Sequence, residues 1–193
     1  MTIGVDLDNT IAETYAYKKI FIESILKREI AYSSNPDDYM GFDVDDIEEK
    51  LIRSNEPDFK DWLERIEVSP YSVQCLQQYC KQGCKIYVIT GRGVGDNQDE
   101  RKPTVSWLAK YNVPYNGIVF THDKGKVCKQ LGIDLMFEDY PQYIEGIIND
   151  SPSTRVFIRE HLYNSQCRQK YRYAFNVRSF KSWYELLNFD CGV

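Results

Sequence analysis

Two aspartates near the start of the chain have a spacing that suits catalysis. Asp6 and Asp8 follow a short apolar run and are separated by a single residue. In extended backbone, side chains two residues apart project to the same side, which brings both carboxylates over one small volume. Such crowding of negative charge is unfavourable without a compensating cation. Taken alone, the pair is better explained as polar residues at the end of a strand. A catalytic role therefore depends on whether other functional groups lie beside the two carboxylates.

Later segments carry groups that would complete such a site. Thr90, Lys124 and the acidic pair at 138–139 each stand at or just after the end of a later apolar run. In open α/β sheets, ligands bind in the crevice beyond the carboxyl ends of the strands. We therefore expect these side chains to meet the two aspartates in one pocket, and their coincidence favours a functional site.

The carboxylates predict a magnesium site. Hard oxygen ligands suit Mg²⁺, which usually keeps several waters and a substrate phosphate oxygen. The expected ligands are Asp6, Asp8 and Asp139. Glu138 is a further candidate, with an equal claim to be no more than a charge at the end of a strand. Lys124 supplies positive charge beside the carboxylates.

The chemistry expected of this set is hydrolysis of a phosphate ester in two steps. Asp6 attacks phosphorus in line and forms an aspartyl-phosphate. Asp8 protonates the leaving alkoxide in the first step and activates water in the second. Thr90, Lys124 and the free backbone N–H groups expected at 9–11, where a helix is predicted to start, hold the phosphoryl oxygens. Neither histidine of the chain has a role in this scheme.

Other residues near these motifs are candidate contacts to the substrate. Thr10, Gly91 and Arg92 lie within or beside the expected pocket, although Arg92 is also well explained as a surface arginine. Tyr15 follows shortly after the catalytic strand and could stack on a nucleobase, with core packing of a small cap as the alternative. Lys126 competes for the phosphate with the lysine two residues before it.

The elements that must position these residues follow from the apolar pattern. Short β-rich runs that alternate with helical patterns predict a parallel sheet built from βα units. The central runs are apolar at successive positions, as in strands that are covered on both faces. The expected strands are 2–7, 84–90, 117–121, 134–138 and 154–158, with helices at 73–82, from 103 through 108, 126–131 and 141–149. The last part is expected to be an irregular loop at 161–170, a strand near 173–177 and a helix near 179–187.

A separate helical segment is expected after the first strand. About seventy residues separate the first two strands, far more than one crossover helix needs. Helical patterns cover 13–30 and 44–54, and apolar residues recur at helical spacing from Phe59 to Ile66. The predicted fold is therefore α/β, a three-layer Rossmann-like parallel sheet with a small helical cap inserted after the first strand. The core would comprise residues 1–13 and 71–193, and the cap residues 14–70.

Charge and hydropathy limit the partners. The net charge of −5 over 193 residues argues against binding to a nucleic acid polymer or to an anionic membrane surface. Residues 35–68 carry twelve acids and four bases, whereas residues 151–193 carry seven bases and three acids. No apolar run is long enough to span a bilayer, and the first residues lack the pattern of a signal peptide. We expect a cytoplasmic protein with a small-molecule phosphate ester as its partner, and the oligomeric state stays open.

The motifs in this order resemble those of the haloacid dehalogenase (HAD) superfamily of phosphohydrolases. The matching segments are the first strand through Asp-Leu-Asp-Asn-Thr at 6–10, Tyr-Val-Ile-Thr at 87–90, Lys124, and Phe-Glu-Asp at 137–139. The resemblance implies that Asp6 is the nucleophile, and that Asp8 is the acid and base and also a metal ligand through its backbone carbonyl. It further implies that Asp139 binds the metal.

A looser resemblance points to one group within the superfamily. The Thr-Gly-Arg loop at 90–92, the helix around 104–108, and the segments 162–164 and 182–183 are similar to the cytosolic 5′(3′)-deoxyribonucleotidase-like group. This similarity implies a (deoxy)nucleoside monophosphate as the substrate. One alternative keeps the chemistry but acts on sugar or polyol phosphates. Another, from a different class, is a receiver-like phospho-acceptor module, which would lack both Asp8 and a cap.

Overall fold

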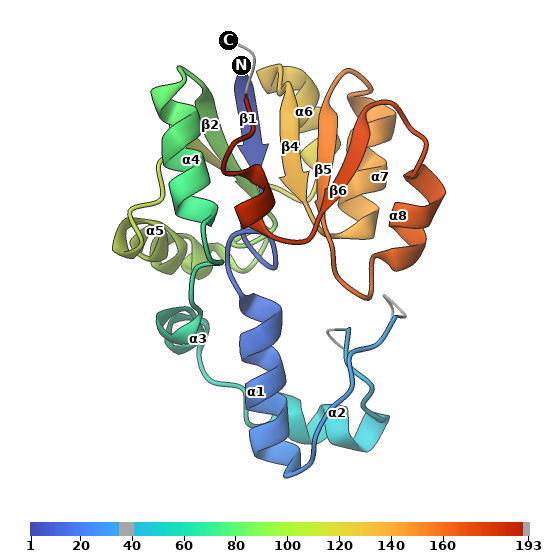
Figure 1. Ribbon diagram of the computed structural model, residues 1–193. Coiled ribbons are helices and arrows are strands. Elements are labelled where there is room, and N and C mark those ends of the chain that lie inside the picture. The colour runs from blue at the N-terminus through green and yellow to red at the C-terminus, as the bar shows by residue number, and fades with distance from the viewer. Residues whose placement is uncertain (35–40, 191–193) are drawn as a thin grey trace.

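The computed structural model describes residues 1–34 and 41–190, and its centre is a six-stranded parallel sheet (Figure 1). The strands follow the order β3-β2-β1-β4-β5-β6, so β1 lies between β2 and β4. Their bounds are β1 Thr2–Val5, β2 Lys85–Thr90, β3 Gly117–Phe120, β4 Leu135–Glu138, β5 Arg155–Arg159 and β6 Val177–Phe180. All five expected strands are present. The register pairs Val5 with both Val88 and Phe137, which brings the ends of β1, β2 and β4 together.

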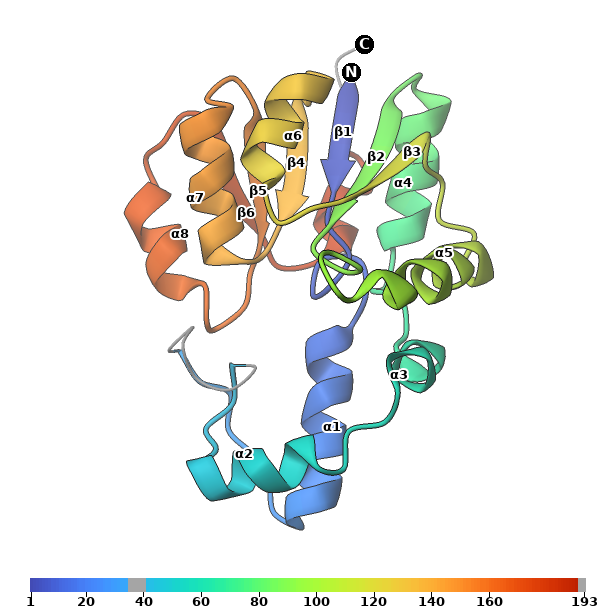
Figure 2. The ribbon, with the colours of Figure 1, turned by 180° about the vertical axis from the view of Figure 1, so that it is seen from behind.

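Helices cover both faces of the sheet, as expected for a three-layer fold. On one face, α4 and the short 3-10 helix η3 pack on Ile3 and Val5, and Trp183 of η3 is fully buried. On the other face, α6 and α7 pack over Met136 and Ile89 (Figures 1 and 2). The bounds are α4 Ser72–Lys81, α5 Arg101–Lys110, α6 Lys124–Leu131, α7 Pro141–Asp150 and η3 Trp183–Leu186. Among the described residues, no helix has the length and apolar character needed to cross a membrane.

Three helices between β1 and β2 lie beyond the carboxyl ends of the strands (Figure 1). They are α1 Thr14–Leu26, α2 Asp46–Arg53 and α3 Phe59–Arg65, and they are called the cap below. Asp45 starts α2 with a capping box, since its side chain accepts from the backbone N–H groups of Ile47 and Glu48. Residues 35–40 of the expected cap lie outside the described residues. The boundaries at 14 and 70 remain predictions.

The end of the chain differs from expectation. The segment 161–170, expected to be an irregular loop, contains helix α8, Ser165–Tyr171. Only Cys167 of this helix is buried, so its sequence lacks the apolar stripe that identifies a helix. The last strand lies at Val177–Phe180 instead of 173–177. It is an edge strand with two exposed residues, so its sequence gives only a weak apolar signal for its bounds. The expected helix at 179–187 is reduced to the 3-10 turn η3.

Two helices begin earlier than their sequence signals suggested. Helix α5 starts at Arg101, preceded by the 3-10 turn η2, Gln98–Glu100, so Pro103 is its third residue and not its first. A proline is tolerated there because the first four N–H groups of a helix have no partner within it. Helix α6 starts at Lys124, with Asp123 as its cap. This two-residue difference changes the environment of Lys124.

Candidate active site

The ends of β1, β2 and β4 open into one cavity of about 490 Å³ on the cap side of the sheet. Its position is the one expected for a parallel α/β sheet, beyond the carboxyl ends of the strands. Six of the residues named from the sequence line this cavity: Asp6, Asp8, Gly91, Arg92, Glu138 and Asp139. Asn9, Glu100, His122, Tyr140, Gln142 and Tyr143 complete the lining.

A buried lysine joins two of the carboxylates. The Lys124 ammonium lies 2.5 Å from Asp6 Oδ1 and 2.7 Å from Glu138 Oε2. All three residues are at most 5% exposed. Lys124 is the first residue of α6, the helix that follows β3. Lys126 is exposed and pairs with Asp123, so the structure brings Lys124, and not Lys126, to the aspartate.

Burial governs the protonation of this group. Desolvation raises the pKa of Asp6 to about 7, against the opposing effect of the Lys124 charge. The pKa of Lys124 is raised, because the attraction of Asp6 and Glu138 outweighs the effect of burial. Glu138 also accepts hydrogen bonds at Oε1 from the backbone N–H groups of Asp139 and Tyr140. Glu138 is therefore more than a charge at a strand end, since both of its oxygens are engaged.

Asp139 is held from three sides. Its carboxylate accepts hydrogen bonds from the hydroxyl of Thr10, at 3.0 Å, and from that of Tyr163. Its backbone carbonyl accepts from the Asn164 amide at 2.8 Å. Burial, followed by the nearby charge of Asp6, raises the pKa of Asp139 to about 7. The carboxylate is thus fixed in orientation but poorly compensated in charge.

Three of these carboxylates form a group that suits a metal ion. One oxygen each from Asp6, Glu138 and Asp139 lies within 4.8 Å of the others, and all three side chains are buried. Lys124 provides one positive charge for three carboxylates, so the group retains negative charge in a desolvated place. A divalent cation with a preference for hard oxygen ligands, such as Mg²⁺, fits both the donor set and this charge.

The Asp8 carboxylate lies outside that group. The Arg92 guanidinium binds both of its oxygens, with Nε 2.7 Å from Oδ2 and Nη2 2.6 Å from Oδ1. The hydroxyl of Thr14, the first residue of α1, donates to Oδ1 at 2.5 Å. Burial would raise the pKa of Asp8, but the charge and hydrogen bonds of Arg92 and the Thr14 bond hold it well below its usual range.

The separation of Asp6 and Asp8 follows from the backbone. The expectation that both carboxylates project to one side required extended backbone through residue 8, whereas β1 ends at Val5. The Asp6 N–H still pairs with the Phe137 carbonyl, and the chain turns at 9–11, where Asn9 has φ 57°, in the left-handed region that asparagine tolerates. The Asp8 side chain is therefore not placed as a ligand in the three-carboxylate group. A role for its backbone carbonyl remains a prediction.

The same turn overturns one sequence expectation. The N–H groups of residues 9–11 were expected to be free at a helix start. Instead, Asn9 N donates to the carbonyl of Ala12, and Thr10 N and Ile11 N donate to that of Leu7. Helix α1 begins only at Thr14. These three N–H groups are engaged within the turn, so they do not offer phosphate donors.

On the β2 side, the loop residues close the cavity. Thr90 is buried, and its hydroxyl oxygen accepts from the backbone N–H of Arg92 at 3.2 Å. A Cβ at Gly91 would lie 3.0 Å from the Tyr143 hydroxyl and 3.1 Å from His122 Nδ1, so glycine leaves room in the cavity. Arg92 is only 6% exposed, which corrects the interpretation as a surface arginine. Its ion pair with Asp8 explains the burial.

Two candidate substrate contacts lie away from the cavity surface. Thr10 is fully buried, and its hydroxyl is used on Asp139. Tyr15 is buried in an aromatic cluster of the cap, stacked on Tyr32 and tilted against Phe42, with its hydroxyl donating to the Gly41 carbonyl. Neither lines the cavity of the carboxylates. Tyr15 therefore packs in the core of the cap, which was the alternative to stacking on a nucleobase.

The segment after β5 supplies contacts that were not anticipated. Tyr163 bonds Asp139 and stacks on His161, whose Nε2 lies 2.8 Å from the carbonyl oxygen of Asn9. Asn164 bridges Asp139 and the Arg159 carbonyl. The sequence signal that could have identified these residues was their position after β5. This strand neighbours β4, so the carboxyl ends of both strands lie at the same edge of the sheet. On the opposite wall, Tyr143 lies over Lys124, with Nζ 4.3 Å from the ring centroid.

Comparison with known proteins assigns the chain to a family. The sequence profile described as "5' nucleotidase, deoxy (Pyrimidine), cytosolic type C protein" matches residues 1–185. "Putative nucleotidase YqfW" of Bacillus subtilis is 27% identical, over 72% of this chain and 70% of its own length. A "Putative nucleotidase" of Bacillus cereus is 23% identical, over 96% of each chain.

Solved structures share the fold at low sequence identity. A HAD family hydrolase from Deinococcus radiodurans, solved with bound phosphate and sodium, has a TM-score of 0.65 and 12% identity, and the match covers 96% of this chain and 92% of that one. The fold is thus that of a HAD family hydrolase. The family profile covers nearly the whole chain. The chain belongs to the cytosolic type C family of 5′ nucleotidases.

Proposed function

We propose that the protein hydrolyses (deoxy)nucleoside monophosphates through an aspartyl-phosphate on Asp6, with Mg²⁺ bound at the carboxylate group. The observation that carries this proposal is the buried assembly of Asp6, Lys124, Glu138 and Asp139 at the meeting point of the strand ends. When bound, Mg²⁺ supplies Lewis-acid stabilisation of phosphoryl charge. Asp6, Glu138 and Asp139 are the residues that would hold it.

In the first step, Asp6 is the nucleophile. Lys124 donates to Oδ1, and no hydrogen-bond donor among the described residues contacts Oδ2, which leaves that oxygen for attack on phosphorus. The new bond joins Oδ2 to phosphorus, and the bond from phosphorus to the ester oxygen breaks. The leaving alkoxide takes a proton from the Asp8 carboxyl. In the second step, Asp8 accepts a proton from water, and the resulting hydroxide attacks phosphorus as the bond from phosphorus to Oδ2 breaks. Phosphate leaves, Asp6 is restored, and Asp8 releases its proton to solvent.

Because the pKa of Asp8 is lowered, the proton that Asp8 gives to the leaving alkoxide must first be supplied to its carboxylate. Because Arg92 keeps Asp8 ionised at neutral pH, the carboxylate must be protonated before it can act as an acid. A phosphate monoester has a second pKa of about 6, so the monoanionic form of the substrate carries the required proton. The proposed sequence therefore starts with transfer of that proton to Asp8. Arg92 holds the same carboxylate in its basic form for the second step.

The substrate class is supported by the family and by the names of the two relatives, which are nucleotidases. Sugar or polyol phosphates remain the second candidate, because selection depends on the walls of the cavity and not on the core chemistry. The receiver-like alternative loses its support, since the chain belongs to a hydrolase family and has both Asp8 and a cap. The cytosolic type of the family supports a cytoplasmic location.

The decisive experiment is a phosphate-release assay over a substrate panel. Purified protein is offered deoxynucleoside monophosphates, ribonucleoside monophosphates and sugar phosphates, in Mg²⁺ and after removal of metal with EDTA. We expect the highest kcat/KM on a nucleoside monophosphate, no turnover in EDTA and none for Asp6→Asn, whose fold is checked by circular dichroism. A higher kcat/KM on sugar phosphates would overturn the substrate class, and an active Asp6→Asn would overturn the mechanism.

A further inference from the structure

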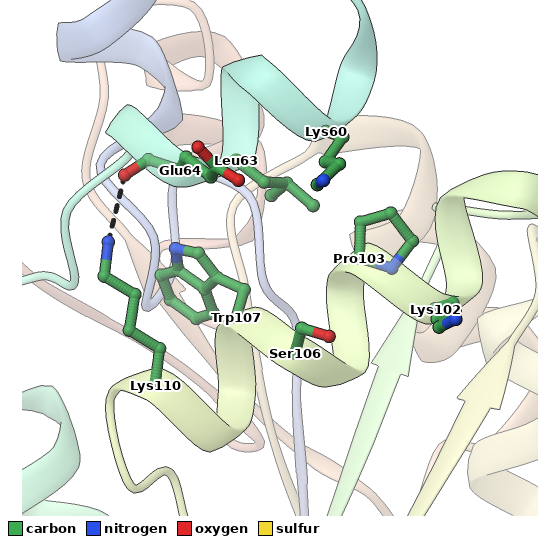
Figure 3. A pocket seen from close by; sticks show the side chains of 8 residues that line it. All are labelled: Lys60, Leu63, Glu64, Lys102, Pro103, Ser106, Trp107 and Lys110. Carbon is green, nitrogen blue, oxygen red and sulfur yellow. Dashed lines mark hydrogen bonds between the residues drawn. The ribbon is translucent and has the colours of Figure 1, made fainter.

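A second pocket lies at the junction between the cap and the core (Figure 3). It has a volume of about 430 Å³, within the range of small-molecule sites. Helix α3 of the cap forms one wall and helix α5 of the core forms the other. We call it the junction pocket, and its lining residues are Lys60, Leu63, Glu64, Lys102, Pro103, Ser106, Trp107 and Lys110. It shares no lining residue with the cavity of the carboxylates.

The walls of the junction pocket are fixed by hydrogen bonds between the cap and α5. The Trp107 indole N–H donates to the carbonyl of Ile66 at 2.9 Å, and the Tyr111 hydroxyl donates to the same carbonyl at 3.1 Å. The Lys110 ammonium donates to the carbonyl of Glu64 at 2.9 Å. Each bond joins α5, or the residue directly after it, to the end of α3. The pocket therefore needs no rearrangement of these walls to receive a ligand, which lowers the cost of binding.

The lining combines an apolar floor with a positive rim. Leu63 points from α3 toward α5, where Pro103 and Trp107 provide the opposite apolar surface (Figure 3). Three lysines and one glutamate surround this floor. The ammonium groups of Lys60 and Lys102 have no hydrogen-bond or ion-pair partner among the described residues. The positive charge at this pocket contrasts with the negative net charge of residues 35–68, where twelve acids face four bases.

We propose that the junction pocket binds a small organic anion with an apolar body and one negatively charged head group. The apolar body would contact Leu63, Pro103 and Trp107, since burial of apolar surface is the main source of affinity in such pockets. The head group would lie between Lys60 on the cap and Lys102 on the core, where two unpaired ammonium groups attract one anion. Such a ligand touches both sides of the junction and stabilises their contact. This site is independent of the proposed phosphatase activity.

The test uses anilinonaphthalene sulfonate, a fluorescent aromatic anion, titrated into the whole protein. Charge reversal in the double variant Lys60→Glu/Lys102→Glu should weaken binding about tenfold or more. The matched control, Lys85→Glu/Lys129→Glu, reverses two exposed lysines outside the pocket and should change the dissociation constant less than about twofold. Ser106→Trp fills the pocket from the exposed face of α5 and should abolish binding without touching any lysine.

Two further arms assign the bound probe to this pocket. N-phenylnaphthylamine, which lacks the sulfonate, should respond to Ser106→Trp but not to the lysine reversals. Asp6→Asn should bind the anionic probe as the wild type does, because Asp6 lies in the other cavity. Equal affinity in the wild type, the Lys60→Glu/Lys102→Glu variant and Ser106→Trp would overturn the proposal, and so would loss of binding in Asp6→Asn alone. Neither result depends on whether the protein hydrolyses any phosphate ester.

Discussion

The Arg92 guanidinium holds both carboxylate oxygens of Asp8, at 2.7 and 2.6 Å, while Thr14 of the cap donates to one of them. This contact connects three parts of the molecule: the turn after β1, the loop after β2 and the first residue of α1. It also gives the two aspartates different surroundings. Asp6 faces the lysine and the carboxylate group, whereas Asp8 faces an arginine that fixes its orientation and its charge.

Arg92→Lys is therefore expected to impair catalysis although it keeps the positive charge. Lysine is a point charge and does not reproduce the planar fork that orients Asp8. Displacement of the Asp8 carboxylate, the proposed acid and base, is expected to lower kcat about 10- to 100-fold. The measurement is kcat on the best substrate of the panel, with the exposed Arg65→Lys as the control. A kcat within experimental error of the wild type would show that the Arg92 fork has no part in the reaction.

Lys124→Met is expected to destabilise the fold as well as abolish turnover. Methionine keeps much of the volume but removes the one ammonium among the described residues that contacts the buried carboxylates of Asp6 and Glu138. Removing one partner of a buried ion pair costs about 3–5 kcal/mol. Urea unfolding without added metal measures the loss.

The matched control for this change is Lys126→Met. Lys126 lies two residues further along and is exposed, and it pairs with the exposed Asp123. We expect its unfolding midpoint and its kcat to equal those of the wild type. If Lys124→Met and Lys126→Met behave alike, the buried lysine is not the group that compensates Asp6.

The sequence was sufficient to predict the sheet and the meeting point of its strand ends, because both depend on local apolar pattern and on a general rule of parallel sheets. The positions of Lys124 and Asp139 beside Asp6 were predicted in this way, whereas a contact of Thr90 with phosphate remains a prediction. The orientation of Asp8 was not predictable, since it depends on a turn at Asn9 and on an arginine 84 residues away in the chain. Helix α8 escaped detection because its sequence buries only Cys167. Tyr163 and Asn164, which hold Asp139, lie just before that helix.

Mg²⁺ is expected to stabilise the folded protein through the carboxylate group. A ligand that binds only the folded state at about 100 times its dissociation constant adds about 2.7 kcal/mol to the free energy of unfolding. The melting temperature should therefore rise with Mg²⁺ in the wild type and stay constant in Asp139→Asn. Asp150→Asn, at the exposed end of α7, serves as the control and should respond as the wild type does. A full response in Asp139→Asn would place the cation elsewhere.

Tyr163→Phe is expected to weaken metal binding without unfolding the protein. The Tyr163 hydroxyl is buried and donates to the Asp139 carboxylate. Its loss leaves the Thr10 hydroxyl as the one remaining donor to this carboxylate among the described residues. Partners that orient metal ligands typically account for about 10- to 100-fold in affinity. The phenyl ring keeps the stacking on His161 and the edge-on contact with Tyr15, which protects the fold. Isothermal titration with Mg²⁺ measures the change, and the exposed Tyr184→Phe is the control. An unchanged dissociation constant in Tyr163→Phe would mean that Asp139 needs no support from the segment after β5, or that Asp139 does not bind the ion, and the Asp139→Asn variant separates these two cases.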